Sequence, residues 1–152
     1  MRAGGLAGFA LGAALLAGAE APSQDNEPTP AVVNERLDAM NGMAAAMKAM
    51  SQRIESGRDL AGIRELALQV RSVAVTIPAL FPPGSRKGLT NATEAVWERR
   101  PEFEDRARAL ERESAKLAEI AATESPSDIA DQFRAVGRVC ASCHETFRKR
   151  KD

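Results

Sequence analysis

The sequence is poor in the side chains that most functional sites use. It contains one histidine, two cysteines, one tryptophan and no tyrosine, and aromatic residues make up only 4% of its 152 residues. So few cysteine and histidine side chains exclude a zinc site with four such ligands and a scaffold held by many disulfides. An excess of charge is also lacking, since 21 basic and 21 acidic residues cancel. Nucleic-acid-binding proteins usually have a basic excess, so we predict no nucleic-acid partner.

The composition otherwise fits one globular domain behind a leader. Apolar residues make up 44% and charged residues 28% of the chain, as in folded proteins. Residues 1–19 have the features of a secretory signal: Arg2, an uncharged apolar run over 6–16, and the cleavage sequence Ala17-Gly18-Ala19. The run is shorter than the roughly 20 residues that span a bilayer, and no cysteine follows it to carry a lipid anchor. We therefore expect an exported protein with no membrane anchor in its mature form.

The rest of the chain is patterned as helices. Residues 20–30 hold three prolines among polar residues and predict a flexible linker. Over 31–152 the apolar residues recur with a helical period, and no segment alternates as a half-buried strand would. The spacing and the prolines predict helices over about 31–56, 59–77, 102–123 and 128–149, a loop over 81–88 and a short turn near Trp97. We predict an all-α fold, an antiparallel four-helix bundle, in one domain over 31–152.

The predicted inward faces follow from the same period. The first helix would direct Val33, Leu37, Met40, Ala44, Met47 and Ile54 into the bundle. The last helix would direct Ile129, Phe133, Val136, Cys140, Cys143 and Phe147 inward. Both cysteine sulfurs are therefore predicted to lie in the core.

The motif that carries chemistry is Cys-Ala-Ser-Cys-His over residues 140–144. C-x-x-C-H is the attachment signature of c-type haem, in which each thiol adds to one vinyl group and forms a thioether. On a helix, positions i, i+3 and i+4 share a face, so Cys140, Cys143 and His144 would point the same way. The imidazole of His144 can then bind the haem iron as its proximal ligand.

Three other interpretations of the motif stay open at this point. A redox dithiol of the thioredoxin type usually opens a helix after a strand, and no strand is predicted here. A structural disulfide suits an exported protein, but two cysteines three residues apart within a helix have an awkward geometry for that bond. The histidine could also follow the cysteines by chance. The export signal and the inward placement of both cysteines favour haem attachment.

The opposite side of the iron has several candidate occupants. His144 is the only histidine, so a second imidazole from this chain is excluded, which leaves a methionine, a lysine, an exogenous molecule or an empty site. The first helix carries four methionines spaced 3, 4 and 3 residues apart, namely Met40, Met43, Met47 and Met50. A methionine thioether can bind haem iron, although flexible core packing is the alternative for each of them.

Two basic features also have two interpretations each. Arg36, one turn before Met40, is either a partner for a haem propionate or a solvated surface charge. The basic run over 148–151 is either a solvated helix end or a partner for propionates or an acidic redox protein.

These residues resemble the class II c-type cytochromes, the cytochrome c′ and cytochrome c-556 family. In that family the haem motif lies close to the C-terminus, and here only eight residues follow His144. The similarity covers essentially the whole predicted mature chain and is strongest over residues 135–148. The segments that match upstream are Arg-Leu-Asp-Ala-Met over 36–40, Leu-Phe-Pro-Pro-Gly-Ser over 80–85, Val96-Trp97 and Phe103.

The resemblance implies a periplasmic four-helix bundle, often a homodimer, with one haem c attached through two thioethers. By position, Cys140 and Cys143 would hold the haem, His144 would be the proximal iron ligand, Arg36 would lie near the propionates and Met40 would occupy the distal side. Some members are six-coordinate through a methionine and carry electrons, and others are five-coordinate and high-spin and bind nitric oxide or carbon monoxide.

The methionine-rich first helix favours the first of these functions. We therefore expect an electron carrier with His144 and Met40 as iron ligands, which exchanges single electrons with redox partner proteins and performs no enzymatic turnover. The alternative is the gas-binding function on an open distal side. A haem-free dithiol oxidoreductase is the third hypothesis.

Overall fold

The computed structural model describes Met1 and residues 31–86, 90–123 and 125–150. The predicted linker, 20–30, and all of the predicted signal except Met1 lie outside the described residues, so both stay predictions. The described helices are α1 (Ala31–Ser56), α2 (Ile63–Thr76), the 3₁₀ helix η2 (Ile77–Leu80), α3 (Ala95–Glu98), α4 (Arg100–Ala121) and α5 (Pro126–Phe147). Among them, none combines the length and apolar content that crossing a membrane requires.

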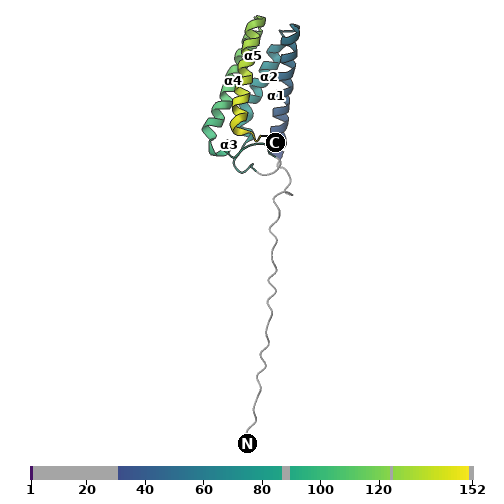
Figure 1. The fold of residues 1–152 in the computed structure, drawn as a ribbon. Coiled ribbons are helices and arrows are strands. Elements are labelled where there is room, and N and C mark those ends of the chain that lie inside the picture. The colour runs from purple at the N-terminus through teal and green to yellow at the C-terminus, as the bar shows by residue number, and fades with distance from the viewer. Residues whose placement is uncertain (2–30, 87–89, 124, 151–152) are drawn as a thin grey trace.

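The four long helices run side by side as an antiparallel bundle, which confirms the predicted fold class (Figure 1). The helix α2 packs against α1 and α4, and α4 also packs against α5. The helices α1 and α5 are neighbours too, but theirs is the loosest packing among the adjacent long helices. The short helix α3 lies at one end of the bundle (Figure 1). At that end Thr93 N–H donates to Phe147 O over 3.0 Å, and Lys149 N–H donates to Asn91 O over 2.8 Å. These bonds attach the last turn of α5 to the segment before α3.

The helix boundaries match the predictions to within a few residues. The first helix has the predicted bounds, because Gly57 with a φ of 65° ends it in the left-handed conformation that glycine favours. The second helix begins at Ile63 rather than at 59, since Asp59 also has a positive φ of 52° and is held by a 2.8 Å bond from Arg53. Both α4 and α5 begin about two residues early because their prolines sit in the first turn, where no N–H is needed.

The predicted inward face is confirmed in part for the last helix and is wrong in part for the first. On α5, Ile129, Val136 and Phe147 are buried as predicted, and both cysteines are half-buried rather than enclosed. On α1, Leu37 is 39% exposed and Ala44 is exposed, whereas the buried residues are Val33, Arg36, Met43, Ala46 and Met50. The error arises because an apolar period cannot assign an arginine to the interior.

Candidate haem site

The last turns of α5 bring the motif residues onto adjoining positions of one helix. Cys140 and Cys143 are half-buried free thiols that pack against the edge of the core, and the neighbouring residue His144 is exposed. Within the described part of the chain, no three His, Cys, Asp or Glu side chains converge on a metal site of their own. The free thiols speak against a structural disulfide.

The pKa values of the two thiols argue against the interpretation of the motif as a redox dithiol. Burial raises the pKa of Cys140. It also raises the pKa of Cys143 to about 11, with a smaller contribution from Cys140, while the charge of Arg106 acts in the opposite direction. Reactive redox cysteines have a lowered pKa, because the thiolate is the nucleophile. Both thiols are therefore protonated at neutral pH, which is unsuitable for thiol–disulfide exchange.

The imidazole of His144 is kept in the form that binds metals. Although the residue as a whole is exposed, enough of the ring is covered that burial lowers its pKa, and the charge of Arg148 lowers it further. A lowered pKa means that the neutral imidazole persists to lower pH. Neutral imidazole is the common metal ligand, so His144 is suited to bind iron.

The four methionines of α1 divide into two pairs. Met43 and Met50 are buried in the hydrophobic core, with 8% and 0% of their surface exposed. Met40 and Met47 are half-buried and pack at the edge of the core. The buried pair is core packing, so Met40 and Met47 are the two that remain available to a cofactor beside α1.

Arg36 is buried, with 4% of its surface exposed, so its interpretation as a solvated surface charge is wrong. Its guanidinium donates to Leu80 O, to Ser85 O over 3.1 Å and to Ser85 Oγ. It also stacks 4.3 Å from the Phe81 ring centroid and 5.7 Å from that of Trp97. Arg36 therefore fastens the segment after η2 to the first turns of α1. Whether it also meets a haem propionate stays a prediction.

Ser85 bonds Arg36, a contact that the sequence did not predict. It is 7% exposed, and its hydroxyl accepts from Arg36 and donates to Pro82 O over 2.7 Å. The preceding Gly84 has a φ of 81°, which lets the chain turn there. A serine directly after a turn glycine was the available signal, but its partner lies 49 residues away.

Ser85→Ala should destabilise the bundle by about 1–3 kcal/mol, because it leaves the buried guanidinium donor of Arg36 that bonds Ser85 Oγ without an acceptor. Urea unfolding measures the effect as a lower midpoint at an unchanged slope. Ser72→Ala, on the exposed side of α2, is the matched control and should change nothing. Equal midpoints for the two variants would show that the Arg36–Ser85 contact contributes no stability.

An aromatic row connects Arg36 with the end of α5. Ring centroids are 5.0 Å apart for Phe81 and Phe103 and 5.2 Å apart for Phe103 and Phe147, both in edge-on geometry. Phe147 lies one turn after Cys143. The row therefore places Arg36, the segment after η2 and the cysteine motif at one end of the bundle.

The described helices and the haem motif fall within a stretch that matches a known family. Residues 31–148 match the profile of cytochrome c′. The chain belongs to the cytochrome c′ family. It is thus a class II c-type cytochrome, with a four-helix bundle and one covalently attached haem c.

Named relatives of this cytochrome c′ homologue agree with the assignment. Cytochrome c-554 of Cereibacter sphaeroides is 35% identical over 80 residues, which cover 51% of this chain and 52% of the relative. The match thus spans about half the length of that protein. Cytochrome c′ of Pararhodospirillum photometricum is 29% identical over 121 residues, which cover 78% of this chain and 97% of the relative.

Solved structures show the same fold. Cytochrome c′ from Thermochromatium tepidum superposes with a TM-score of 0.74 at 25% identity, and the match covers 78% of this chain and 95% of that one. A variant of cytochrome c prime from Alcaligenes xylosoxidans, in complex with nitric oxide, superposes with a TM-score of 0.72 at 24% identity and covers 79% and 94%. At this level of identity the second likeness establishes the bundle and no more.

The residues of this cytochrome fit a haem between α1 and α5. On α1, Leu37 is exposed and Met40 and Met47 are half-buried, and on α5, Phe133 and the two cysteines are half-buried. These apolar side chains belong to the two adjacent long helices that pack most loosely on each other. A cofactor site is mostly apolar with a few polar groups at its edge. Arg36 and His144 are such polar groups at this end of the bundle.

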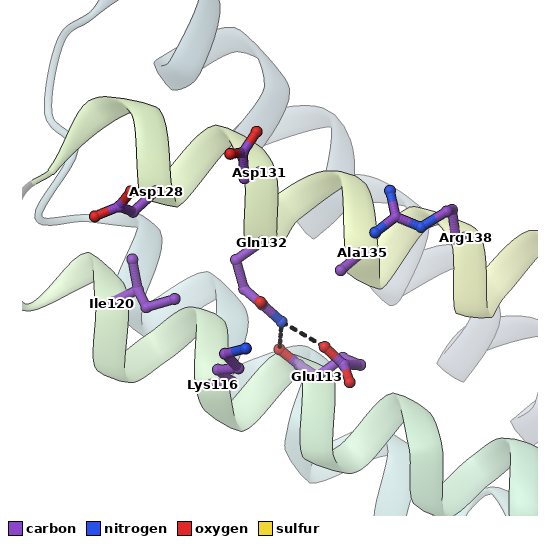
Figure 2. A pocket seen from close by; sticks show the side chains of 8 residues that line it. All are labelled: Glu113, Lys116, Ile120, Asp128, Asp131, Gln132, Ala135 and Arg138. Atoms are coloured by element: carbon purple, nitrogen blue, oxygen red, sulfur yellow. Dashed lines mark hydrogen bonds between the residues drawn. The ribbon is translucent and has the colours of Figure 1, made fainter.

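The groove between α4 and α5 farther from the motif is a different feature (Figure 2). Its lining is mixed in charge: Glu113, Lys116, Ile120, Asp128, Asp131, Gln132, Ala135 and Arg138. The buried Gln132 side chain donates to Glu113 O over 3.0 Å and to Glu113 Oε2 over 2.6 Å, so it joins the two helices. None of the lining residues belongs to the haem motif.

The charge of Arg148 gives a pH prediction for the ferric holoprotein, given that His144 binds iron as the resemblance implies. A lowered pKa keeps the imidazole neutral as the pH falls, so acid competes weakly with iron. Arg148→Gln removes one of the two causes and raises the pKa of His144. We expect acid to release the imidazole at a higher pH than in wild type, as measured by absorbance titration. Arg150→Gln is the control, and coinciding midpoints for all three proteins would contradict the prediction.

Proposed function

We propose that Cys140 and Cys143 form the two thioethers and that His144 is the one protein ligand to a five-coordinate iron whose distal side binds nitric oxide or carbon monoxide. The observation that carries this proposal is that His144 is the only imidazole of the chain, while Met40, the distal candidate, packs against the hydrophobic core. When bound, the haem supplies an iron that exchanges one electron and binds diatomic gases.

The residues of the chain have separate tasks in this proposal. The two cysteines would hold the haem through thioethers, and the neutral His144 side chain would supply a nitrogen ligand to its iron. Met40 covers the distal side without bonding, which admits a small gas and excludes larger ligands. Arg36 holds the segment over 80–85 against α1, and with it one border of the site. The same fold accommodates nitric oxide in the Alcaligenes xylosoxidans protein.

The electron carrier with His144 and Met40 as ligands is the second candidate. It was the function favoured by the methionine-rich helix, and Met40 and Met47 both remain at the edge of the core beside the proposed site. The family relationship supports the gas-binding function better, since cytochrome c′ is the family that matches over residues 31–148. Both functions are non-catalytic, and for both we propose a periplasmic protein. Redox partner proteins and a homodimer stay predictions.

Spectroscopy of the holoprotein separates the two candidates. We expect ferric protein with high-spin electron paramagnetic resonance and ferrous protein whose absorption changes when carbon monoxide is added. A low-spin ferric signal together with a ferrous spectrum that is indifferent to carbon monoxide would overturn the gas-binding proposal and show that the iron has a sixth ligand. Haem staining on a denaturing gel, before and after alkylation of free thiols, tests the thioethers independently of spin state.

A further inference from the structure

Arg106 on α4 carries a buried hydrogen-bond donor that no other residue satisfies in the described part of the chain. The donor is its Nε–H, which is shielded from solvent. Its outer nitrogen lies 3.6 Å from Glu102 Oε1, at the partly exposed tip of the side chain. Buried donors in folded proteins are nearly always paired, so an unpaired one requires an explanation.

The position of Arg106 points to the haem motif. The helices α4 and α5 are antiparallel, and Phe103 on α4 contacts Phe147 on α5. A residue one turn after Phe103 on α4 therefore lies beside a residue one turn before Phe147 on α5. These residues are Arg106 and Cys143. Their proximity also shows in acidity, because the charge of Arg106 lowers the pKa of the Cys143 thiol against the larger effect of burial.

We propose that Arg106 raises the reduction potential of the haem, because it holds a fixed positive charge beside the Cys143 attachment point. The inference rests on the attachment through Cys143 in the proposed function. A guanidinium stays charged at every physiological pH. When iron gains one electron, the net charge of the site becomes less positive, so a nearby cation stabilises the reduced state. Partial burial strengthens this interaction relative to water.

Glu102 acts in the opposite direction, because its carboxylate lies within ion-pair distance of the same guanidinium. It partly neutralises the charge of Arg106 at the exposed tip, while the buried Nε faces away from water. The two residues thus predict potential shifts of opposite sign, which a change of packing alone would not produce.

The test is a redox titration of the holoprotein with small-molecule mediators, after a haem-stained gel has confirmed covalent attachment. At a fixed solution potential we expect Arg106→Gln to lower the ratio of reduced to oxidised haem about threefold. For one electron this corresponds to a reduction potential lower by about 28 mV. Arg106→Lys keeps the charge and should stay close to wild type, and Glu102→Gln should raise the ratio. Arg112→Gln, an exposed arginine on the same helix, is the matched control and should change nothing.

The outcomes decide the inference either way. An unchanged ratio in Arg106→Gln, or an equal loss in Arg106→Lys, would overturn it, and so would a shift accompanied by a changed ferric spectrum, because iron ligation would then be the cause. If the attached haem is present and the shift is absent, the inference fails while the proposed attachment stands. If wild-type protein carries no covalent haem, both fail. Should Arg106→Gln not fold, Arg106→Lys and Glu102→Gln still give predictions of defined sign.

Discussion

Replacing Cys140 and Cys143 together with serine should yield a colourless protein whose helices no longer unfold cooperatively. No thioether can form, so the cofactor is lost. Residues 31–150 contain only four phenylalanines and one tryptophan, and the apolar side chains Met40, Met47 and Phe133 are only half-buried by the protein itself. Completing the burial of each such side chain is worth about 1 kcal/mol. Together with the covalent anchor, this is a large share of the roughly 5–15 kcal/mol that stabilises a domain.

Circular dichroism during thermal unfolding measures the loss, and absorbance at the haem bands measures the cofactor. Ser142→Ala is the matched control, since Ser142 lies between the two cysteines and its hydroxyl makes only a 3.4 Å contact to Val139 O. This control should keep both the colour and the transition. A double variant that is fully helical and melts in one sharp transition would show that the bundle does not depend on its cofactor.

The fold was predictable because its determinants are local. Gly57 and the prolines mark where helices end and begin, and the apolar period within each helix needs no knowledge of its neighbours. The start of α2 was missed, because the positive φ of Asp59 and its bond from Arg53 depend on the exact path of the turn. The rotation of α1 was missed for a different reason. The residue that faces inward near its start is Arg36, and hydropathy places arginine outside.

The site residues also differ in whether local sequence or tertiary packing determines their role. Cys140, Cys143 and His144 are neighbours on one helix, so their spacing alone predicts that they act together. Ser85 and Arg106 lie on other elements, and only tertiary packing shows that the first bonds Arg36 and that the second stands level with Cys143. Whether Met40 bonds iron depends on where the bundle places one thioether, and no sequence pattern encodes that position.

Met40→Ala should therefore be the most informative single substitution. In the proposed five-coordinate protein, a gas must displace the Met40 side chain from its packing against the core before it reaches the iron. Removing a barrier of about 1.4 kcal/mol increases a rate tenfold, and the packing of a half-buried methionine is worth about that much. We expect carbon monoxide to bind ferrous Met40→Ala about tenfold faster or more, with a ferric spectrum that stays high-spin.

Flash photolysis measures the rate, and Met47→Ala is the matched control, because Met47 is also half-buried on α1 but lies two turns further along it. Both substitutions shorten a methionine at the edge of the core, so a general loosening of the bundle would accelerate both. Acceleration confined to Met40→Ala places that side chain on the path of the gas. A low-spin wild type that becomes high-spin only in Met40→Ala would instead identify Met40 as an iron ligand. In that case the rate gain comes from a broken bond, and the electron-carrier function replaces the one proposed.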